Sequence, residues 1–376
     1  MTPSTATRGV TILGATGSIG TAALRVIDRH RDRFHVRGLT AHSNATLLAE
    51  QVAAWRPAYV GLVQGAAADW NSGAEVLVQA ATDPSADVVL NAVVGSAGLE
   101  ATLAALEAGK RVALANKESL VMGGELVTTA AQANRGQLVP VDSEHSAILQ
   151  CLAGRQASEV RRLIITASGG PFRTWPADRI ADATLTDALN HPTWSMGRKI
   201  TVDSASLVNK ALEVIEAHFL FGVPYDRIDV VVHPQSIVHS MVEFIDGSVV
   251  AQLGVPSMEL PILYALSYPD RFEDDGVTRF DPVAAAALTF EAVRTDAFPA
   301  FRMGLEAGRA GGVAPAVFNA ANEAAVQRFL DGSLTFGGIP RAIDAALAAH
   351  GHRPLDGIGS LRDADRAARS LVQELH

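Results

Sequence analysis

The chain has 376 residues, 48% of them hydrophobic and 19% charged, so it can bury sizeable cores and is predicted to form about two or three domains. Its formal net charge of -9 argues against nucleic acid or an anionic membrane as its main partner. The single cysteine, Cys151, excludes an internal disulfide and a thiolate metal cluster.

The first residues, MTPSTATRG, lack an apolar signal core. No uninterrupted apolar run approaches the roughly 18 residues that a membrane span needs. Because the cysteine usage also fits a reducing compartment, we expect a cytoplasmic protein.

A strand-like run from Val10 to Leu13 leads into the glycine-rich turn GATGSIG, Gly14 to Gly20, and then into a helical pattern. This order is the context of a dinucleotide site, because glycines let the backbone approach a pyrophosphate and a helix N-terminus offers free N–H groups. The spacing G-x-x-G-x-x-G is a variant of the usual pattern, and such turns also form for tight packing alone.

The next strand, His35 to Thr40, ends at AHSN, Ala41 to Asn44, where this architecture meets the adenosine ribose. The tetrad has no acidic residue that would select NAD, which leaves room for the 2′-phosphate of NADP. It has no arginine or lysine either.

The alternation of strands and helices continues to Val141 and predicts a parallel sheet covered on both faces. ANKES, Ala115 to Ser119, lies at the carboxyl end of a strand, where such sheets bind their ligands. An ordinary solvated helix start is the alternative for Lys117 and Glu118.

Two carboxylates, Asp142 and Glu144, follow the apolar run from Gln137 to Val141. On an extended segment, residues i and i+2 point the same way, so both carboxylates can face one point. Such a pair suits Mg²⁺ or Mn²⁺. The alternative is that Asp142 or Ser143 merely caps the following helix.

After Glu144 the regular alternation of strands and helices ends, which predicts a second domain. The strand-like run Arg162 to Ala167 leads into SGGPFR, a plausible anion-binding turn. The irregular stretch about 168–199, with glycines and two tryptophans, predicts a lid over a site. A buried Trp194 is the alternative.

One helix is predicted from Thr201 to Phe219, with Asp203 or Ser204 as its cap. On the polar side of this helix, Glu213 would complete a group of three carboxylates with Asp142 and Glu144. An anion would then be bound beside it by Ser204, Asn209 and Lys210. A simple surface ion pair between Lys210 and Glu213 is the alternative.

The remainder is predicted to contain a hairpin at Asp246-Gly247 and, from about Asp281, a helical bundle. His239 is interpreted as structural, and His233 is left undecided. The predicted buried helix faces are Phe318, Ala321, Ala325 and Phe329, and Leu361, Ala364, Ala368, Leu371 and Leu375.

Seven motifs in one order resemble those of the 1-deoxy-D-xylulose 5-phosphate reductoisomerase family. They are GATGSIG, ANKESLV, PVDSEHSA, SGGPFR, HPTWSMGRK, DSASLVNKALEVIEA and HPQSIVHSMV. The resemblance implies an α/β fold with a Rossmann-like NADPH-binding parallel-sheet domain (1–142). An α+β catalytic metal- and substrate-binding domain (143–270), a linker (271–296) and a C-terminal α-helical domain (297–376) would follow. It also implies a homodimer.

The resemblance assigns roles residue by residue. Its divalent-metal ligands are Asp142, Glu144 and Glu213, and Lys117 and Glu118 join them in the catalytic set. Its substrate-phosphate ligands are Ser168, Ser204, Asn209 and Lys210. Its other substrate contacts are Lys117, Ser143, Glu144, His191, Glu213 and His233, with Trp194 and Met196 in the lid. Its dinucleotide contacts are Gly14, Thr16, Gly17, Ser18, Ile19, Asn44, Asn116, Glu118 and Gly197.

The implied reaction rearranges a phosphorylated ketose, 1-deoxy-D-xylulose 5-phosphate, and reduces it with NADPH to 2-C-methyl-D-erythritol 4-phosphate for isoprenoid precursor biosynthesis. Mg²⁺ or Mn²⁺, with Co²⁺ as a further option, would polarise the substrate ketone. Ser43 stands where the family often has a basic residue, which bears on the preference for NADPH and not on the activity.

Two other functions stay open at this point. A different NADP-dependent oxidoreductase, of the semialdehyde or homoserine dehydrogenase type, would need no carboxylate trio. A non-catalytic NADP(H)-sensing regulator would bind the nucleotide without turnover.

Overall fold

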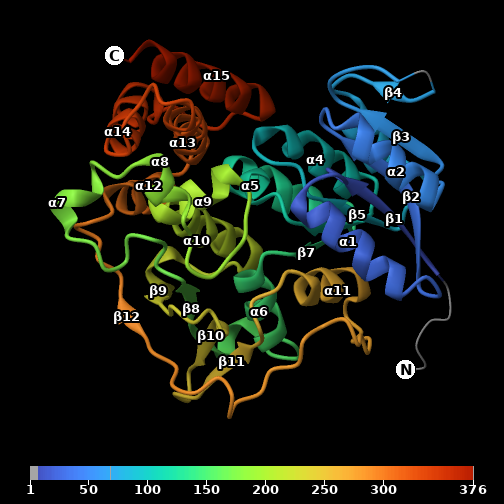
Figure 1. Cartoon of the computed structure of the whole chain (residues 1–376), viewed down its shortest axis with the longest axis horizontal. Coiled ribbons are helices and arrows are strands. Elements are labelled where there is room, and N and C mark those ends of the chain that lie inside the picture. The colour runs from blue at the N-terminus through green and yellow to red at the C-terminus, as the bar shows by residue number, and fades with distance from the viewer. Residues whose placement is uncertain (1–6, 68, 376) are drawn as a thin grey trace. The chain divides into compact units, whose positions relative to one another are not determined.

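The computed structural model describes residues 7–67 and 69–375, so the first six residues of MTPSTATRG lie outside the described part. The chain forms two compact units, and Figure 1 labels their elements. The first unit contains Met1–Ser119, Glu125–Ser146 and Ser257–Arg279, and the second contains Leu120–Gly124, Ala147–Pro256 and Phe280–His376. The four-part domain division that the family resemblance implies stays a prediction.

The first unit is built on a parallel sheet with strand order β4-β3-β2-β1-β5-β6-β7. The strands are β1 Arg8–Leu13, β2 Phe34–Ala41, β3 Tyr59–Leu62, β4 Asn71–Ser72, β5 Val88–Asn91, β6 Arg111–Leu114 and β7 Gln137–Pro140. The chain runs outward from β1 to β4 and then returns to β5 beside β1, so the connections reverse between β1 and β5. Ligands bind at such a switch point in open α/β sheets.

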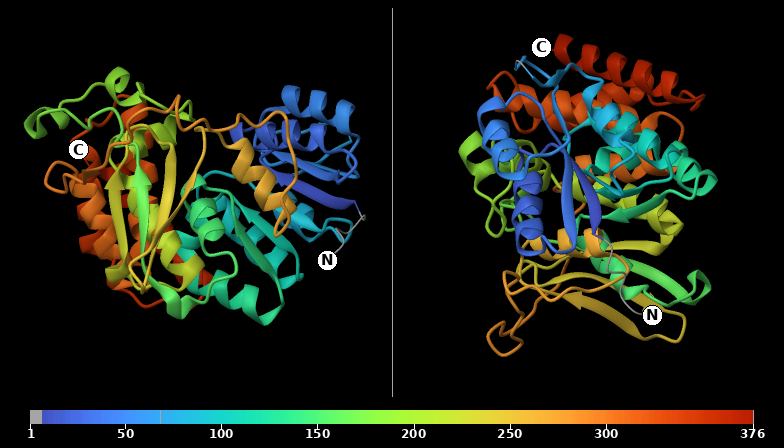
Figure 2. Two further views of the ribbon diagram at one scale, coloured as in Figure 1. Left: turned by 90° about the horizontal axis from the view of Figure 1, so that it is seen from below. Right: turned by 90° about the vertical axis from the view of Figure 1, so that its right-hand side faces the viewer.

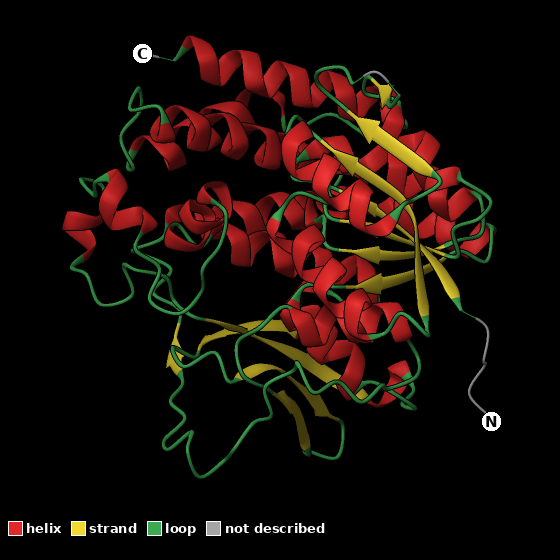
Figure 3. Cartoon of the chain, turned by 45° about the vertical axis from the view of Figure 1, so that its right-hand side comes forward, coloured by secondary structure: helices red, strands yellow, loops and turns green. Residues whose placement is uncertain are grey.

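Helices cover this sheet on both faces, as the burial of its central strands shows. All four residues of β5 are buried, as are successive residues of β1, so neither face is open to water. Figure 3 shows the strands in yellow and the helices in red. The helices are α1 Ser18–Arg29, α2 Ala45–Trp55, α3 Val76–Thr82, α4 Leu99–Glu107 and α5 Lys117–Ala133, with the short η1 Ser96–Gly98. The predicted parallel-sheet architecture is confirmed.

The segment Ser257–Arg279 returns to the first unit through α11, Glu259–Ser267, which packs against α1. Arg29 of α1 makes two ion pairs with it, to Glu259 and to Asp274, both at 2.7 Å. Burial by itself would raise the pKa of Asp274. The hydrogen bond from Arg29 is the largest of the contributions that lower it, and together they hold the pKa of Asp274 below its ordinary value. These contacts explain why a stretch so late in the sequence belongs to the first unit.

The second unit holds a mixed sheet with strand order β11-β10-β8-β9-β12, drawn in green and yellow in Figure 2 apart from β12. Its strands are β8 Val160–Ala167, β9 Ile228–Val232, β10 Val238–Phe244, β11 Val249–Leu253 and β12 Glu291–Ala292. Strand β8 pairs with β9 in parallel and with β10 antiparallel. Asp246 and Gly247 form the turn between β10 and β11, as predicted, with Gly247 at φ +84°.

Helices make up the rest of the second unit. They are α7 Ala177–Ile180, α8 Leu185–Leu189, α9 Arg198–Ala205, α10 Val208–Phe221, α12 Pro299–Ala310, α13 Ala314–Leu330, α14 Gly338–His350 and α15 Ile358–Glu374, with η2 Ala157–Glu159 and η3 Tyr225–Arg227. Helix α6, Ser143–Cys151, has residues in both units. The predicted C-terminal bundle is confirmed, since α13 packs against α12, α14 and α15. None of the helices in the described ranges has the length and apolar character needed to cross a membrane.

Two details of the helical predictions are wrong. The helix predicted from Thr201 to Phe219 is two helices, α9 and α10, because Leu207 between them adopts a left-handed conformation with φ +58°. Asp203 and Ser204 therefore lie inside α9 and cap nothing. In α15 the buried stripe ends on Val372 instead of Leu371 and Leu375, since the helix turns slightly less per residue than the predicted spacing assumed.

Candidate functional site

The glycine-rich turn between β1 and α1 is shaped for close approach. Gly14 has φ +84°, and a Cβ on it would lie 2.7 Å from the carbonyl oxygen of Ala92. Gly17 precedes α1, and Ser18 and Ile19 begin it, so their N–H groups have no acceptor within the helix. The predicted strand–turn–helix context is confirmed, and its free N–H groups suit an anion.

The AHSN tetrad ends β2 and starts α2 on the surface of the first unit. His42, Ser43 and Asn44 are exposed. Asn44 caps α2, with its Oδ1 accepting from the N–H of Leu47 at 3.1 Å. The tetrad thus presents three polar side chains, none of them acidic, at the carboxyl end of a strand, where the ribose lies in this architecture.

Asn116 organises the loop after β5. It is fully buried and caps α5. Its Nδ2 lies within hydrogen-bond distance of the carbonyls of Val93 (2.8 Å) and Gly95 (2.9 Å) and of Glu118 Oε2 (3.0 Å). The side chain therefore holds two neighbouring loops at the carboxyl end of the sheet.

Strands β6 and β7 are hydrogen-bonded neighbours, so the segments that follow them lie side by side. Lys117, after β6, forms an ion pair with Asp142, after β7. The Lys117 side chain is only 6% exposed, so its ammonium group is held against this carboxylate away from bulk water. The ordinary solvated helix start that was the alternative for Lys117 does not describe this environment.

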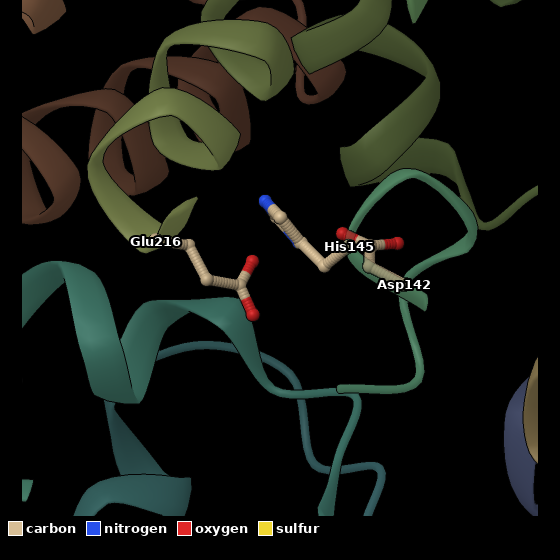
Figure 4. A group of neighbouring side chains, drawn as sticks. All are labelled: Asp142, His145 and Glu216. Atoms are coloured by element: carbon tan, nitrogen blue, oxygen red, sulfur yellow. The ribbon is translucent and has the colours of Figure 1, made fainter. Parts of the chain in front are cut away.

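Asp142 and Glu144 are neighbours in space, with carboxylate oxygens within 4.8 Å of each other. Their arrangement differs from the predicted one, because Glu144 lies in the first turn of α6 and not on an extended segment. The serine between them, Ser143, donates from its Oγ to Glu144 Oε2 at 2.5 Å. Figure 4 shows Asp142 together with His145, a fully buried residue of the same turn that the sequence reasoning did not single out.

A hydroxyl–imidazole cluster lies in the second unit. His191 Nε2 is 3.0 Å from Ser168 Oγ and 3.2 Å from Ser204 Oγ. Ser168 directly follows β8 and precedes Gly169 and Gly170, both at positive φ. Residues 168, 191 and 204, which the sequence places far apart, thus meet at one point.

The protonation of His191 follows from its contacts. Its Nδ1 accepts hydrogen bonds from the N–H groups of Thr193 (3.1 Å) and Trp194 (2.9 Å). The ring proton therefore lies on Nε2, which donates toward the two serine hydroxyls. Burial lowers the pKa of His191 below its ordinary value of 6.5, so the imidazole is neutral near pH 7.

The first turns of α10 carry the remaining predicted residues. Asn209 Nδ2 donates to Glu213 Oε1 at 2.6 Å, and Lys210 pairs with Glu213 Oε2. Lys210 and Glu213 are 4% and 1% exposed, so the surface ion pair that was the alternative is excluded. Glu213 belongs to the second unit, whereas Asp142 and Glu144 belong to the first.

The predicted lid residues are accessible in part. Trp194 and Met196 are half-buried, and the ring of Trp194 lies 6.4 Å from that of His239. Gly197 is exposed, and a Cβ on it would meet nothing within 4 Å. A buried Trp194, the alternative, is therefore not observed.

His233 differs from the other predicted site residues because both of its ring nitrogens are occupied. Its Nδ1 lies 2.8 Å from the carbonyl of Thr289, and its Nε2 accepts from the N–H of Ile237 at 3.2 Å. The ring is fully buried and stacks on Phe290. This geometry supports the backbone behind β9 and offers no free nitrogen to a ligand.

A cavity of about 390 Å³ lies in the second unit among α7, α12 and α14. Its walls are mainly apolar and include Ile180, Phe298, Met303 and Phe336. None of the predicted site residues lines it. The cavity is thus separate from the clusters that carry the polar chemistry.

Three family profiles match the chain. Residues 10–124 match the 1-deoxy-D-xylulose 5-phosphate reductoisomerase profile. Residues 138–221 match the 1-deoxy-D-xylulose 5-phosphate reductoisomerase C-terminal domain, and residues 253–371 match the DXP reductoisomerase C-terminal domain.

Curated relatives are similar over almost the whole chain. A 1-deoxy-D-xylulose 5-phosphate reductoisomerase of Chloroherpeton thalassium is 51% identical, covering 97% of each chain. The protein of the same name from Nocardia farcinica is 53% identical, covering 97% of this chain and 94% of its own.

Solved structures are similar as well. The reductoisomerase from Zymomonas mobilis in complex with NADPH has a TM-score of 0.88 and 40% identity, covering 98% of this chain and 100% of that one. A DOX-P reductoisomerase in complex with NADPH, fosmidomycin and magnesium has a TM-score of 0.91 and 37% identity, covering 97% of each chain.

Proposed function

The chain belongs to the 1-deoxy-D-xylulose 5-phosphate reductoisomerase family, and we propose how its own residues carry out that family's reaction. The protein is an oxidoreductase that uses NADPH and a divalent metal ion to convert 1-deoxy-D-xylulose 5-phosphate into 2-C-methyl-D-erythritol 4-phosphate. The main support for this activity is the similarity to two curated 1-deoxy-D-xylulose 5-phosphate reductoisomerases, which are 51% and 53% identical over 97% of this chain.

NADPH, when bound, supplies the hydride that reduces the rearranged substrate. The turn fits its pyrophosphate, because Gly14 leaves no room for a Cβ and the N–H groups that open α1 point to an anion site. The adenosine ribose and its 2′-phosphate would bind next to Ser43 and Asn44, which are uncharged and exposed. The proposed contacts are Gly14, Thr16, Gly17, Ser18, Ile19, Asn44, Asn116, Glu118 and Gly197.

A divalent ion, Mg²⁺ or Mn²⁺ with Co²⁺ as a further option, supplies the Lewis acidity that polarises the substrate ketone. Asp142, Glu144 and Glu213 would hold it. Their hard carboxylate oxygens fit such ions, and three ligands leave positions open for two substrate oxygens. Lys117 holds a proton at Nζ beside Asp142, and with Glu118 it would assist proton movements of the substrate hydroxyls.

The substrate phosphate would lie among Ser168, Ser204, Asn209 and Lys210. Both serine hydroxyls lie within 3.2 Å of His191 Nε2 and accept from it, which leaves their own O–H groups to donate to the phosphate. Lys210 supplies the positive charge. Ser143 would contact a substrate hydroxyl, and Trp194 and Met196 would cover the substrate. His233 would act indirectly, by holding the backbone at Ile237 in place.

The same enzyme is proposed to be a homodimer. Strand β11 is an edge of the second unit's sheet, and its backbone edge is unpaired in the described chain. Val249 and Val250 on this strand are 50% and 38% exposed, and nearby Ile245 is 68% exposed. An exposed apolar edge strand invites pairing with a second copy. A cytoplasmic location is proposed as well, supported by the lone, buried Cys151 thiol.

The two rival functions are not favoured. A dehydrogenase of the semialdehyde or homoserine type leaves the adjacent Asp142 and Glu144 carboxylates without a use. A non-catalytic sensor leaves the serine–histidine cluster without one.

The test is NADPH oxidation with 1-deoxy-D-xylulose 5-phosphate, with Mg²⁺ and again with excess chelator. Oxidation that requires the metal is expected. Oxidation that survives chelation would overturn the carboxylate trio. A folded protein that binds NADPH without oxidising it would overturn the enzymatic function.

A further inference from the structure

Helix α9 of the candidate phosphate site packs against α13 of the C-terminal bundle. Buried polar side chains join the two helices. Asn322 Nδ2 of α13 donates to Asp203 Oδ1 at 2.8 Å, and Asp203 Oδ2 pairs with Lys199 Nζ at 2.9 Å. Asp203 and Asn322 are 1% and 0% exposed. A buried carboxylate is stable only when paired and hydrogen-bonded, so these contacts fix Asp203 in place.

The position of α9 matters for the site because the next residue is Ser204. Its Oγ lies 3.2 Å from His191 Nε2. Its carbonyl oxygen would lie 2.7 Å from a Cβ on Gly170, so the turn after Ser168 packs tightly on α9. A small displacement of α9 would therefore disturb two of the hydroxyls at once.

The amide of Asn322 is held at a cost that packing does not explain. Its Oδ1 is buried and has no hydrogen-bond partner among the described residues. A buried, unsatisfied carbonyl is destabilising, and an apolar side chain of similar volume would avoid it. The gain that offsets this cost is the N–H that Asn322 donates to Asp203.

We propose that Asn322 is a positioning residue for phosphate binding, which acts by anchoring Asp203 and thereby α9 and Ser204. The C-terminal bundle then sets the geometry of the substrate site through this hydrogen bond. The inference rests on the proposed function in one respect, namely that Ser168, His191 and Ser204 bind the substrate phosphate.

Asn319 provides a matched control on the same helix. It is also 0% exposed, and its Oδ1 also has no partner in the described chain. Its Nδ2 donates to Glu323 of its own helix at 3.0 Å and not to α9. Asn319→Leu and Asn322→Leu therefore each remove one fully buried amide, but only Asn322→Leu breaks the hydrogen bond to Asp203.

The experiment measures KM and kcat of both variants with 1-deoxy-D-xylulose 5-phosphate, and KM for NADPH. Asn322→Leu should raise the substrate KM about tenfold, because a hydrogen bond to a charged group is among the stronger ones. Its KM for NADPH should stay unchanged, and Asn319→Leu should keep the substrate KM within about twofold of wild type. Equal substrate KM values in the two variants would overturn the proposal.

A charge exchange covers the case in which Asn322→Leu does not fold. Asn322→Asp places two carboxylates together and should raise the substrate KM, and adding Asp203→Asn restores one donor and one acceptor. The double variant should recover part of the lost affinity for substrate. No recovery would mean that Asn322 does not act through Asp203.

Hydrogen exchange separates this inference from the proposed function because it needs no turnover. Backbone amides of residues 201–205 should exchange faster in Asn322→Leu than in Asn319→Leu. Equal exchange would overturn the anchoring of α9. A wild-type protein that does not turn over 1-deoxy-D-xylulose 5-phosphate would instead overturn the proposed function, and with it the phosphate role of α9.

Discussion

Lys210 and Glu213 form a buried ion pair one turn apart on α10, with side chains 5% and 1% exposed. Each is the oppositely charged partner of the other within α10. We propose that the lysine meets a phosphate and the glutamate a metal ion, so each charge later gains a ligand of opposite sign. Because a buried charge without a partner is strongly destabilising, a change at one residue also acts on the other.

Replacing Glu213 with glutamine should abolish turnover and largely spare NADPH binding, because the glycine turn lies in the other compact unit. Loss of a residue that only orients a metal ligand costs about 10–100-fold in activity, so loss of a ligand itself should cost at least as much. Turnover assays and NADPH fluorescence titration would measure the two effects. The control is Glu306→Gln on α12, whose carboxylate is exposed and pairs with Arg302, and which should remain active. Near-normal activity of Glu213→Gln would remove Glu213 from the metal site.

Replacing Lys210 with alanine should raise the substrate KM by about 30-fold, since a hydrogen bond to a charged group contributes about 2 kcal/mol. The variant also leaves Glu213 without its cation, so Mg²⁺ should raise its melting temperature more than that of wild type. Steady-state kinetics and thermal unfolding check both effects. An unchanged KM would show that Lys210 does not contact the phosphate.

His191 should make stability depend on pH. Its pKa in the folded protein lies below the ordinary value of 6.5, so the unfolded chain binds the proton first. The folded state is therefore progressively destabilised as pH falls through 6.5 toward the lower, folded pKa. Urea unfolding on both sides of this range should show a smaller loss for His191→Asn than for wild type. Replacement of the exposed His352 by asparagine is the control, and an equal effect would contradict the prediction.

Replacing Gly14 with alanine should destabilise the first unit by about 2 kcal/mol and weaken NADPH binding, because the residue has positive φ and no room for a Cβ. Gly197→Ala is the comparison, since its Cβ would meet nothing within 4 Å and folding should be unaffected. Denaturant unfolding and NADPH titration measure the effects. Normal stability of Gly14→Ala would argue against the constraint at this turn.

Replacing Val250 with aspartate should convert the proposed dimer into a monomer, because a charge on an exposed edge strand opposes pairing of β11 with a second copy. Sedimentation velocity measures the change. Val283→Asp is the control, since Val283 is 88% exposed and lies outside the sheet. A wild-type protein that sediments as a monomer would remove the dimer from the proposal.

The parts of the architecture that depend on local pattern could be predicted from the amino-acid sequence. Alternation of apolar strands and helices, with a glycine turn after Leu13, sufficed for the parallel sheet and its dinucleotide turn, since strand, turn and helix chemistry are set by neighbouring residues. Family motifs then supplied the activity. The single helix predicted across residues 201–219 failed because the left-handed Leu207 follows from packing and leaves no signature in the apolar spacing.

Which side chains meet, and how exposed they are, depends on long-range packing that local pattern does not encode. The ion pair of Lys117 with Asp142 depends on the pairing of β6 with β7, and the meeting of His191 with Ser168 depends on the path of the loop between them. The contact of Asn322 with Asp203 joins residues 119 positions apart. Such contacts are fixed by how layers of the fold pack, and burial then sets whether a charged pair is a solvated surface feature or a functional one.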